Sequence, residues 1–284
     1  MISARIETLR FHLNGAPVTA IAFIALIILA AAGAPILTAY DPVQGSLFET
    51  LVPPVWEEGG SWAHVLGTDR LGRDIYARLL YGARASVSVA LIAIFVAGTF
   101  GTAVGVIAGY FGGIVDSLIM RGVDLMLSMP LILMAFVFSF VWGPSFGNVI
   151  LVLVLFLWAQ YARQARGEVL SIREREYVTL ARIAGASHIR IMFRHILPNI
   201  VNTLIVLAML QVGRVILLEA SLSFLGVGLP PPQPAWGLMV AEGRGLMTSA
   251  WWISAIPGAV IVLAIVSLNL LGDWLRDILD PKLR

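Results

Sequence analysis

Residues 85–115 decide the fold and read ASVSVALIAIFVAGTFGTAVGVIAGYFGGIV, without a single charge. The stretch exceeds the about 20 apolar residues that a helix needs to cross a bilayer. Such a helix has little hydrophobic drive to meet its neighbours in lipid, so it needs surfaces that allow close backbone contact. Small residues at every fourth position supply one, at Ala97, Gly101, Gly105 and Gly109. We therefore expect a membrane-spanning helix whose small-residue stripe packs against a second helix.

The composition of the whole chain supports a membrane protein. Of 284 residues, 59% are hydrophobic and 13% are charged, whereas soluble domains carry about 25% charged residues. The chain has no cysteine, which excludes disulfide scaffolds, thiolate metal sites and cysteine nucleophiles. The net charge is +2 with a single lysine, Lys282, which excludes a broad polybasic surface for nucleic acid. The predicted class is an all-α polytopic membrane protein that binds no nucleic acid.

Four further uncharged runs complete the predicted spans. The run at 125–162 is interrupted at 142–148 by turn-forming residues, so we expect two spans joined by a tight hairpin. The run at 18–38 is longer than the apolar core of a signal peptide, which favours an uncleaved anchor. The last two runs lie at 195–213 and 245–272. Together they predict six transmembrane helices.

The distribution of basic residues predicts the orientation of these spans. With the N-terminus inside, thirteen Lys and Arg residues face the cytoplasm, against five outside. Membrane proteins concentrate basic residues in cytoplasmic loops, so the N-terminus and the C-terminus are both predicted to be cytoplasmic. Four of the thirteen lie close to the chain ends, at Arg5, Arg10, Lys282 and Arg284.

The loop at 163–198, between the fourth and fifth predicted spans, resembles two short amphipathic helices. One face of the first carries Tyr177, Leu180, Ala181 and Ala184, after which Gly185 and Ala186 break the pattern. Ser187 is a candidate N-cap for the second, whose apolar face would hold Ile189, Met192, Phe193 and Ile196, opposite Arg190 and Arg194. Helices of this kind lie in the headgroup layer or insert into a groove on a partner protein. The pattern alone leaves both readings open.

The spacing from Gly185 to Leu197-Pro198 resembles the cytoplasmic loop of binding-protein-dependent ABC importer permeases. Other segments resemble the C-type subunit of the dipeptide, oligopeptide and nickel permeases within that class. They are 66–74 (LGTDRLGRD), 81–86 (YGARAS), 176–178 (EYV), 194–199 (RHILPN), 219–226 (EASLSFLG) and 230–237 (PPPQPAWG). The resemblance therefore extends over nearly the whole chain.

The resemblance implies a type I importer permease core at 84–273, in a bacterial inner membrane. Residues 1–83 would form a cytoplasmic tail, the first span and an external loop, and residues 274–284 a cytoplasmic tail. It further implies a B-type permease partner, two ATPase subunits docked on the loop at 163–198, and an external binding protein. The substrate would be a di- or oligopeptide, or a related solute such as glutathione or a nickel chelate. Because the chain lacks a G-x-x-x-x-G-K-[ST] phosphate loop, ATP and Mg would be bound by the ATPases and not by this chain.

One position departs from the family pattern. The loop signature usually opens with Glu-Ala-Ala, whereas this chain has Thr179-Leu180-Ala181. If the usual glutamate pairs with the ATPase, this chain must lack that contact or supply it from Glu174 or Glu176.

For two pairs of charged residues outside this loop, the sequence predicts where the side chains lie or what they pair with. Arg214 and Glu219 lie near the outer end of the fifth span, where a buried charge costs about 3 kcal/mol on insertion scales. They are expected to line the pore, to pair with each other, or to extend towards the membrane surface. In the external loop, Asp74 and Arg78 are spaced for an i, i+4 ion pair.

Two rival functions have separate sequence arguments. Residues 143–147 (GPSFG) match the G-x-S-x-G pattern of serine nucleophiles, which would make Ser145 the nucleophile of an intramembrane protease. On the predicted topology, His188 and His195 lie across a bilayer of about 30 Å from Ser145, and only His64 shares its side. We therefore expect no catalytic residue, and the absence of an HExxH motif or clustered ligands predicts no metal site. An ATP-independent channel or secondary transporter remains the other alternative.

Overall fold

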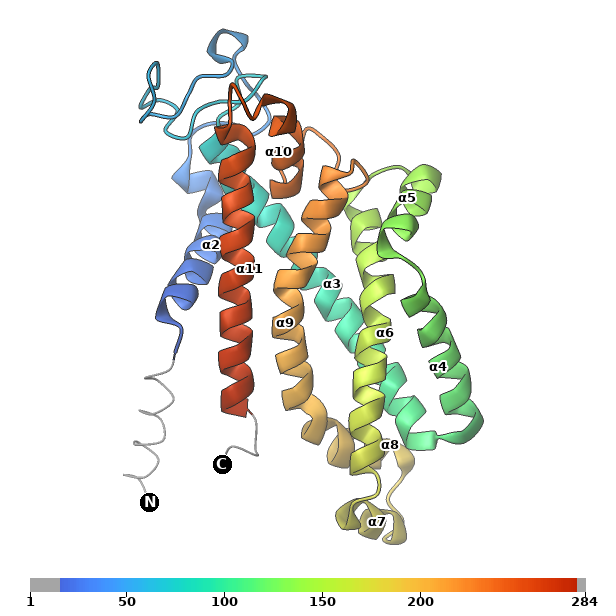
Figure 1. Cartoon of the computed structure of the whole chain (residues 1–284). Coiled ribbons are helices and arrows are strands. Elements are labelled where there is room, and N and C mark those ends of the chain that lie inside the picture. Colours follow the sequence, from blue (N-terminus) through green and yellow to red (C-terminus); the bar gives the residue numbers. More distant parts are fainter. Residues whose placement is uncertain (1–15, 280–284) are drawn as a thin grey trace, which may run out of the picture.

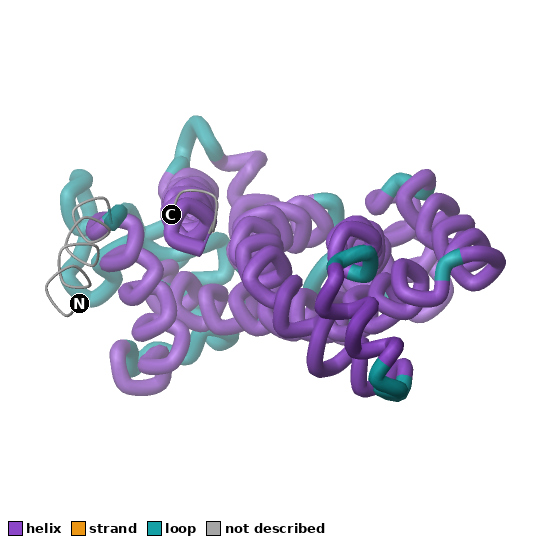
Figure 2. Tube along the Cα trace, turned by 90° about the horizontal axis from the view of Figure 1, so that it is seen from below, coloured by secondary structure: helices purple, strands orange, loops and turns teal. Residues whose placement is uncertain are grey.

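The protein is described by a computed structural model that covers residues 16–279. Within that range the chain forms helices, turns and loops, and no strand (Figure 2). The terminal residues used to predict orientation, Arg5, Arg10, Lys282 and Arg284, lie outside the described residues. The prediction of an all-α fold is confirmed for the described part of the chain.

Five helical segments are long and apolar enough to cross a membrane. They are α2 (Val18–Leu37), α3 (Ile75–Phe111), α6 (Phe146–Ile172), the continuous segment His188–Phe224 that ends in α9 (Leu197–Phe224), and α11 (Trp252–Leu279). A sixth crossing consists of α4 (Gly113–Ser128) and α5 (Leu131–Trp142), which meet at an angle of 85°. The predicted number of six is reached when this bent pair is one span.

The bend between α4 and α5 corrects the prediction of a continuous helix from residue 125 to residue 142. Met129 is extended, with φ −82° and ψ 125°, and Pro130 follows it. A proline disfavours the helical conformation of the residue before it, which ends α4 at this point. The predicted hairpin is confirmed: α5 ends at Gly143, whose φ is +78°, and Ser145 caps the start of α6.

Two predicted span boundaries are also wrong. α3 begins at Ile75, ten residues before the uncharged run, because the Asp74 carboxylate accepts the N–H of Ala77 and caps the helix. An apolar run cannot reveal this extension, since it includes Arg78 and Arg84. α11 begins at Trp252 and not at residue 245, because a short 3-10 turn (Arg244–Leu246) and a further turn precede it.

The small-residue stripe of α3 lies against α6. A Cβ added at Gly101 would come within 2.3 Å of the Trp158 carbonyl oxygen, and one at Gly105 within 2.3 Å of the Ala162 carbonyl oxygen. Ala97 is fully buried, and a Cβ at Gly109 would lie 2.8 Å from the Val169 Cβ. The two helix backbones therefore touch along the stripe, which any larger side chain would force apart.

The bundle has two different ends (Figure 1). One end carries the long loop of residues 41–74 and α10 (Trp236–Gly243), and the other carries α7 (Glu176–Ile183) and α8 (His188–Ile191). α2 starts and α11 stops at the same end as α7 and α8 (Figure 1). α3 runs obliquely through the molecule from one end to the other and so connects the two (Figure 1).

Candidate functional site

The elbow, defined here as residues 176–196, joins α6 to α9 and consists of α7, a turn, α8 and a π-helical segment (Met192–Ile196). The turn is closed by hydrogen bonds from the Gly185 N–H to the Arg182 carbonyl and from the Ala186 N–H to the Ala181 carbonyl. Gly185 has a φ of +78°, in the left-handed region that glycine adopts without strain. Ser187 caps α8, as its hydroxyl oxygen accepts the N–H of Arg190. The structure thus contains two short helices that change direction at Gly185.

The inner side of the elbow is anchored to the bundle. Val178, Ile191 and Ile196 are fully buried and belong to one apolar cluster with Val106 and Val169. The Tyr110 hydroxyl and the His188 Nδ1 lie 2.8 Å apart, and the Arg173 Nη1 donates to the Gly109 carbonyl at 2.8 Å. The end of α3 is therefore tied to the elbow by packing and by the Tyr110–His188 contact, and to the end of α6 by the Arg173 hydrogen bond.

The outer side of the elbow exposes large apolar side chains. Their exposed fractions are 64% for Leu180, 78% for Ile183, 66% for Ile189 and 67% for Phe193. Tyr177 and Ala184 are exposed beside them, and Arg190 and Arg194 are exposed on the same segment. Grouped apolar exposure of this kind marks a surface that contacts protein or membrane.

Two details of the predicted faces differ from the structure. Ala181 is half-buried and packs towards the bundle, whereas Leu180 points outward. Ile189 and Phe193 are exposed, Met192 is half-buried, and Ile196 is fully buried, so these four do not share one face. The reason is the π-helical segment, in which the Leu197 N–H bonds to the Met192 carbonyl and each turn holds more residues than an α-turn.

The acidic residues near the altered signature position lie on the exposed side of the loop. Thr179 is exposed, and so are Glu174 and Glu176. Glu174 accepts a hydrogen bond from the Arg173 Nε at 2.9 Å. Glu176 occupies the first turn of α7, where its charge complements the positive end of the helix dipole.

Arg214 belongs to a polar cluster that joins α6 to α9. The Gln160 Oε1 accepts hydrogen bonds from the Gln211 Nε2 at 2.7 Å and from the Arg214 Nη1 at 3.2 Å. The Arg214 guanidinium carbon lies 5.6 Å from the centre of the Phe156 ring, a cation–π distance. Arg214 is exposed, whereas Gln211 is buried. Gln160 and Gln211 were not predicted as site residues. Their position as polar residues inside apolar runs is a sequence signal that could have identified them.

Glu219 is held separately from Arg214. Its carboxylate accepts hydrogen bonds from the Ser86 hydroxyl and the Ser223 hydroxyl, both at 2.8 Å, and the side chain is fully buried. The expectation that Arg214 and Glu219 pair with each other is therefore wrong. Glu219 instead connects α3 to α9 inside the described part of the chain.

The opposite end of the bundle contains a buried charge network, defined here as Asp69, Arg73, Arg78 and Glu242. Arg73 donates to Asp69 at 2.7 Å and to Glu242 at 3.1 Å. Arg78, which is fully buried, donates to the same two carboxylates at 2.5 Å and 2.6 Å. The network links the loop of residues 41–74, α3 and α10. The spacing of Asp69 and Arg73 was a local signal for part of it, but no local signal relates Arg78 to Glu242.

The predicted ion pair between Asp74 and Arg78 is not formed. One Asp74 oxygen caps α3, and the other lies 2.8 Å from the Nδ1 of the buried His64. Arg78 is engaged by the buried charge network instead. Helical spacing brings the two residues onto one face, but each finds a nearer partner outside the helix.

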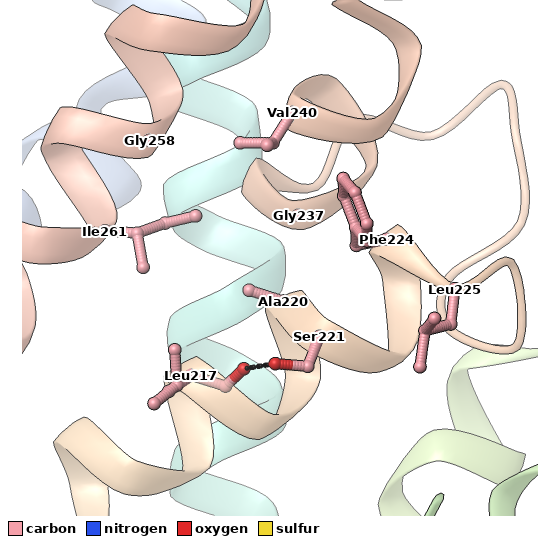
Figure 3. Close-up of a pocket in the computed structure, with 9 residues that line it drawn as sticks. All are labelled: Leu217, Ala220, Ser221, Phe224, Leu225, Gly237, Val240, Gly258 and Ile261. Carbon is pink, nitrogen blue, oxygen red and sulfur yellow. Dashed lines mark hydrogen bonds between the residues drawn. The ribbon is translucent and has the colours of Figure 1, made fainter. Parts of the chain in front are cut away.

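An open apolar pocket of about 370 Å³ lies between α9, α10 and α11 (Figure 3). Leu217, Ala220 and Phe224 of α9 face Val240 of α10 and Ile261 of α11 across it (Figure 3). The Ser221 hydroxyl donates to the Leu217 carbonyl at 2.7 Å, so it offers little unsatisfied polarity to the pocket. A second apolar pocket, of about 690 Å³, lies between α3 and the segment from Met192 to Ala208.

Ser145 has a structural role in the described part of the chain. Its hydroxyl oxygen accepts the N–H of Asn148 at 3.2 Å and so caps α6. The one histidine predicted on its side, His64, bonds to Asp74. Within residues 16–279 no group of three or more His, Asp or Glu side chains is arranged to hold a metal ion.

The apolar crossings and the two distinct ends define a multi-pass membrane protein. A known family, described as the binding-protein-dependent transport system inner membrane component, matches residues 101–284. The chain belongs to this family and is a permease subunit of an ABC transporter, in which a separate subunit is the ATPase.

Relatives and solved structures agree with that family. The dipeptide transport system permease protein DppC of Haemophilus influenzae is 40% identical over 274 residues, which cover 96% of this chain and 93% of that protein. DppC of Escherichia coli is 43% identical, with coverages of 96% and 91%. The probable D,D-dipeptide transport system permease protein DdpC of Escherichia coli is 40% identical, with coverages of 95% and 89%.

Two solved structures share the fold. A chain of the MetNI methionine ABC transporter in inward-facing conformations has a TM-score of 0.58 at 17% identity, covering 71% of this chain and 96% of that chain. A chain of an amino acid ABC transporter has a TM-score of 0.51 at 13% identity, covering 69% and 91%. At these identities the likeness concerns the fold alone.

Proposed function

We propose that this chain is the C-type permease subunit of a bacterial inner-membrane importer of dipeptides. It would form the translocation path with a B-type permease subunit and receive substrate from an external binding protein. Two ATPase subunits, which bind ATP and Mg, would supply the energy. The substrate class is supported by the names of relatives that are 40–43% identical over most of the chain. The elbow would lie in the cytoplasm together with both termini, as the distribution of basic residues predicts.

The observation that carries the proposal is the exposed apolar side of the elbow. Leu180 and Ile183 point outward from α7, Ile189 from α8 and Phe193 from the π-helical segment. Short helices with exposed apolar side chains fit the helix-in-groove mode of protein recognition. A purely interfacial linker would need the same apolar side chains to face the lipid. α7, which carries Leu180 and Ile183, instead projects beyond the ends of the long helices, at the tip of the bundle (Figure 1). This placement favours a partner protein as the surface it contacts.

The contacts on the inner side of the elbow suggest how force would reach the membrane. Val178 and Ile191 are buried against the end of α3, and the π-helical segment leads directly into α9. Packed interiors transmit displacement because they have low compressibility. A push on the outer side of the elbow would therefore move α3 and α9, both of which extend towards the opposite end of the bundle.

The test is ATP-dependent dipeptide uptake by proteoliposomes that contain the complete transporter. Leu180→Glu places a charge on the exposed apolar side of α7 and is expected to lower uptake at least about tenfold, since an unpaired charge in a docking groove costs more than 1.4 kcal/mol. Thr179→Glu is the matched control. It adds the same charge one residue earlier, where similar permeases carry glutamate, and is expected to leave uptake near wild type.

Three results would contradict the proposal. Wild-type uptake by Leu180→Glu with the ATPases still bound would remove the coupling role of the elbow. Flux through this chain alone, without ATP or partners, would establish the channel alternative. Peptide hydrolysis that disappears in Ser145→Ala would establish the protease alternative.

A further inference from the structure

We infer that Arg214 and Gln160 form a carboxylate-binding site on the translocation path, which binds the C-terminal carboxylate of the dipeptide. The inference rests on the proposed function, and it assigns recognition of the substrate's C-terminal carboxylate to the side chains of Arg214 and Gln160. It starts from the polar cluster between α6 and α9, the exposed member of which is Arg214.

Gln160 and Arg214 have hydrogen-bond donors to spare, and the Gln160 oxygen is already occupied. Gln160 Oε1 already accepts from Gln211 and Arg214, and no acceptor is recorded within residues 16–279 for the Gln160 Nε2. A guanidinium has five N–H donors in a planar fork, and one nitrogen of Arg214 is used by Gln160. Both residues therefore present donors, and a carboxylate offers the matching pair of acceptors.

The charge of Arg214 is not neutralised within the described chain. Its recorded partners are an amide oxygen and the face of Phe156, and none of the carboxylates of residues 16–279 forms an ion pair with it. The nearest acidic residue in sequence, Glu219, is buried and bonded to two serines. An exposed, unpaired guanidinium inside an apolar span needs water or an anion beside it, which marks this face of α9 as the side of a hydrated path.

The position along α9 fits a path that enters at the outer pocket. Arg214, Leu217 and Ser221 are spaced i, i+3 and i+7, so they lie on one face of the helix. Leu217 and Ser221 line the pocket between α9, α10 and α11 (Figure 3). At 1.5 Å per residue, Arg214 lies about 10 Å deeper than Ser221. A small peptide that leaves the pocket would meet the guanidinium next.

The absence of cysteine from this chain gives a direct test in the complete transporter. Arg214→Cys is expected to lower dipeptide uptake at least about tenfold, the loss typical of a charge-assisted hydrogen bond. A cationic methanethiosulfonate reagent, which attaches an ammonium group to the thiol, is expected to restore part of the uptake. A neutral reagent of similar size is expected to restore none. Dipeptide should slow the labelling, and an amidated dipeptide should protect less.

Arg121→Cys on α4 is the matched control, because Arg121 is also an exposed arginine. It is expected to transport like the wild type. The wild-type complex, treated with the same reagents, reports any effect of cysteines in other subunits.

The inference is overturned if the thiol at position 214 does not react with the water-soluble reagents, or if Arg214→Cys transports normally. It is also overturned if the substitution releases the partner permease, since Arg214 would then pair with a carboxylate of that subunit. If the wild type takes up no dipeptide, the proposed function fails, whereas labelling at position 214 still reports whether Arg214 faces water.

Discussion

The elbow and the buried charge network lie at opposite ends of the same helix, α3. They differ in whether their side chains find partners within the chain. At the network, two arginines and two carboxylates pair inside the chain, and Arg78 has no exposed surface, although its buried Nε and Nη2 have no recorded partner among residues 16–279. At the elbow, four large apolar side chains remain exposed, and Arg190 and Arg194 lie beside them without a recorded partner among residues 16–279.

The difference shows which end depends on another protein. Burying charged groups is costly unless they are paired and hydrogen-bonded, so removing one member of a network paired within the chain destabilises the chain itself. Exposed apolar area has no such compensation until something covers it. Substitutions at the network should therefore act on folding, and substitutions on the outer side of the elbow should act on coupling. Three predictions test this contrast.

The largest effect is expected at the network. Arg78→Met removes one of two cations and leaves Asp69 and Glu242 with Arg73 alone, which should cost about 3–5 kcal/mol, as for other broken buried pairs. Thermal unfolding of the purified protein in detergent measures the loss. Arg163→Met is the control: it breaks the exposed pair with Asp124, for which about 0–1 kcal/mol is expected. Equal shifts for both variants would show that the buried network does not stabilise the end of the bundle that carries α10.

A smaller effect is expected in the stripe that holds α3 in place between the two ends. Gly105→Ala would bring a Cβ within 2.3 Å of the Ala162 carbonyl oxygen, and overpacking of this kind costs about 1–3 kcal/mol. Gly122→Ala on α4 meets nothing within 4 Å and should be neutral or stabilising by up to about 1 kcal/mol. Thermal unfolding of the two variants separates close contact from the general cost of replacing a helical glycine. A tolerated alanine at position 105 would argue against backbone contact between α3 and α6.

The smallest effect is expected where α3 meets the elbow. Tyr110→Phe removes the hydroxyl that lies 2.8 Å from the His188 Nδ1, and since His188 is exposed, water can replace the lost contact. The expected loss is about 0.5–1.5 kcal/mol. Hydrogen exchange should show faster opening of α8 and unchanged protection at the network. A change that reached the network would show that the two ends unfold together and would weaken the contrast.

The spans followed from the sequence because lipid imposes a length and a composition that can be read locally. The stripe of α3, the turn at Gly143 and the cap at Ser187 were predictable for the same reason, since each depends on neighbours along the chain. The break at Pro130 was not predicted, although the proline itself was a local signal. The predicted apolar face of the elbow was incomplete, because the π-helical segment alters the periodicity on which that prediction depended.

The amino-acid sequence by itself determined that this protein spans the membrane repeatedly, that an amphipathic elbow precedes the fifth crossing, and that the permease family is the one it resembles. These properties come from periodicity, composition and short motifs. The packing of the helices determines that Arg78 binds Asp69 and Glu242 and not Asp74, that the buried Glu219 accepts hydrogen bonds from two serines, and that Arg214 remains exposed beside Gln160. A charged side chain pairs with whichever group the packing of helices brings within about 3 Å, and that distance is not encoded in sequence separation.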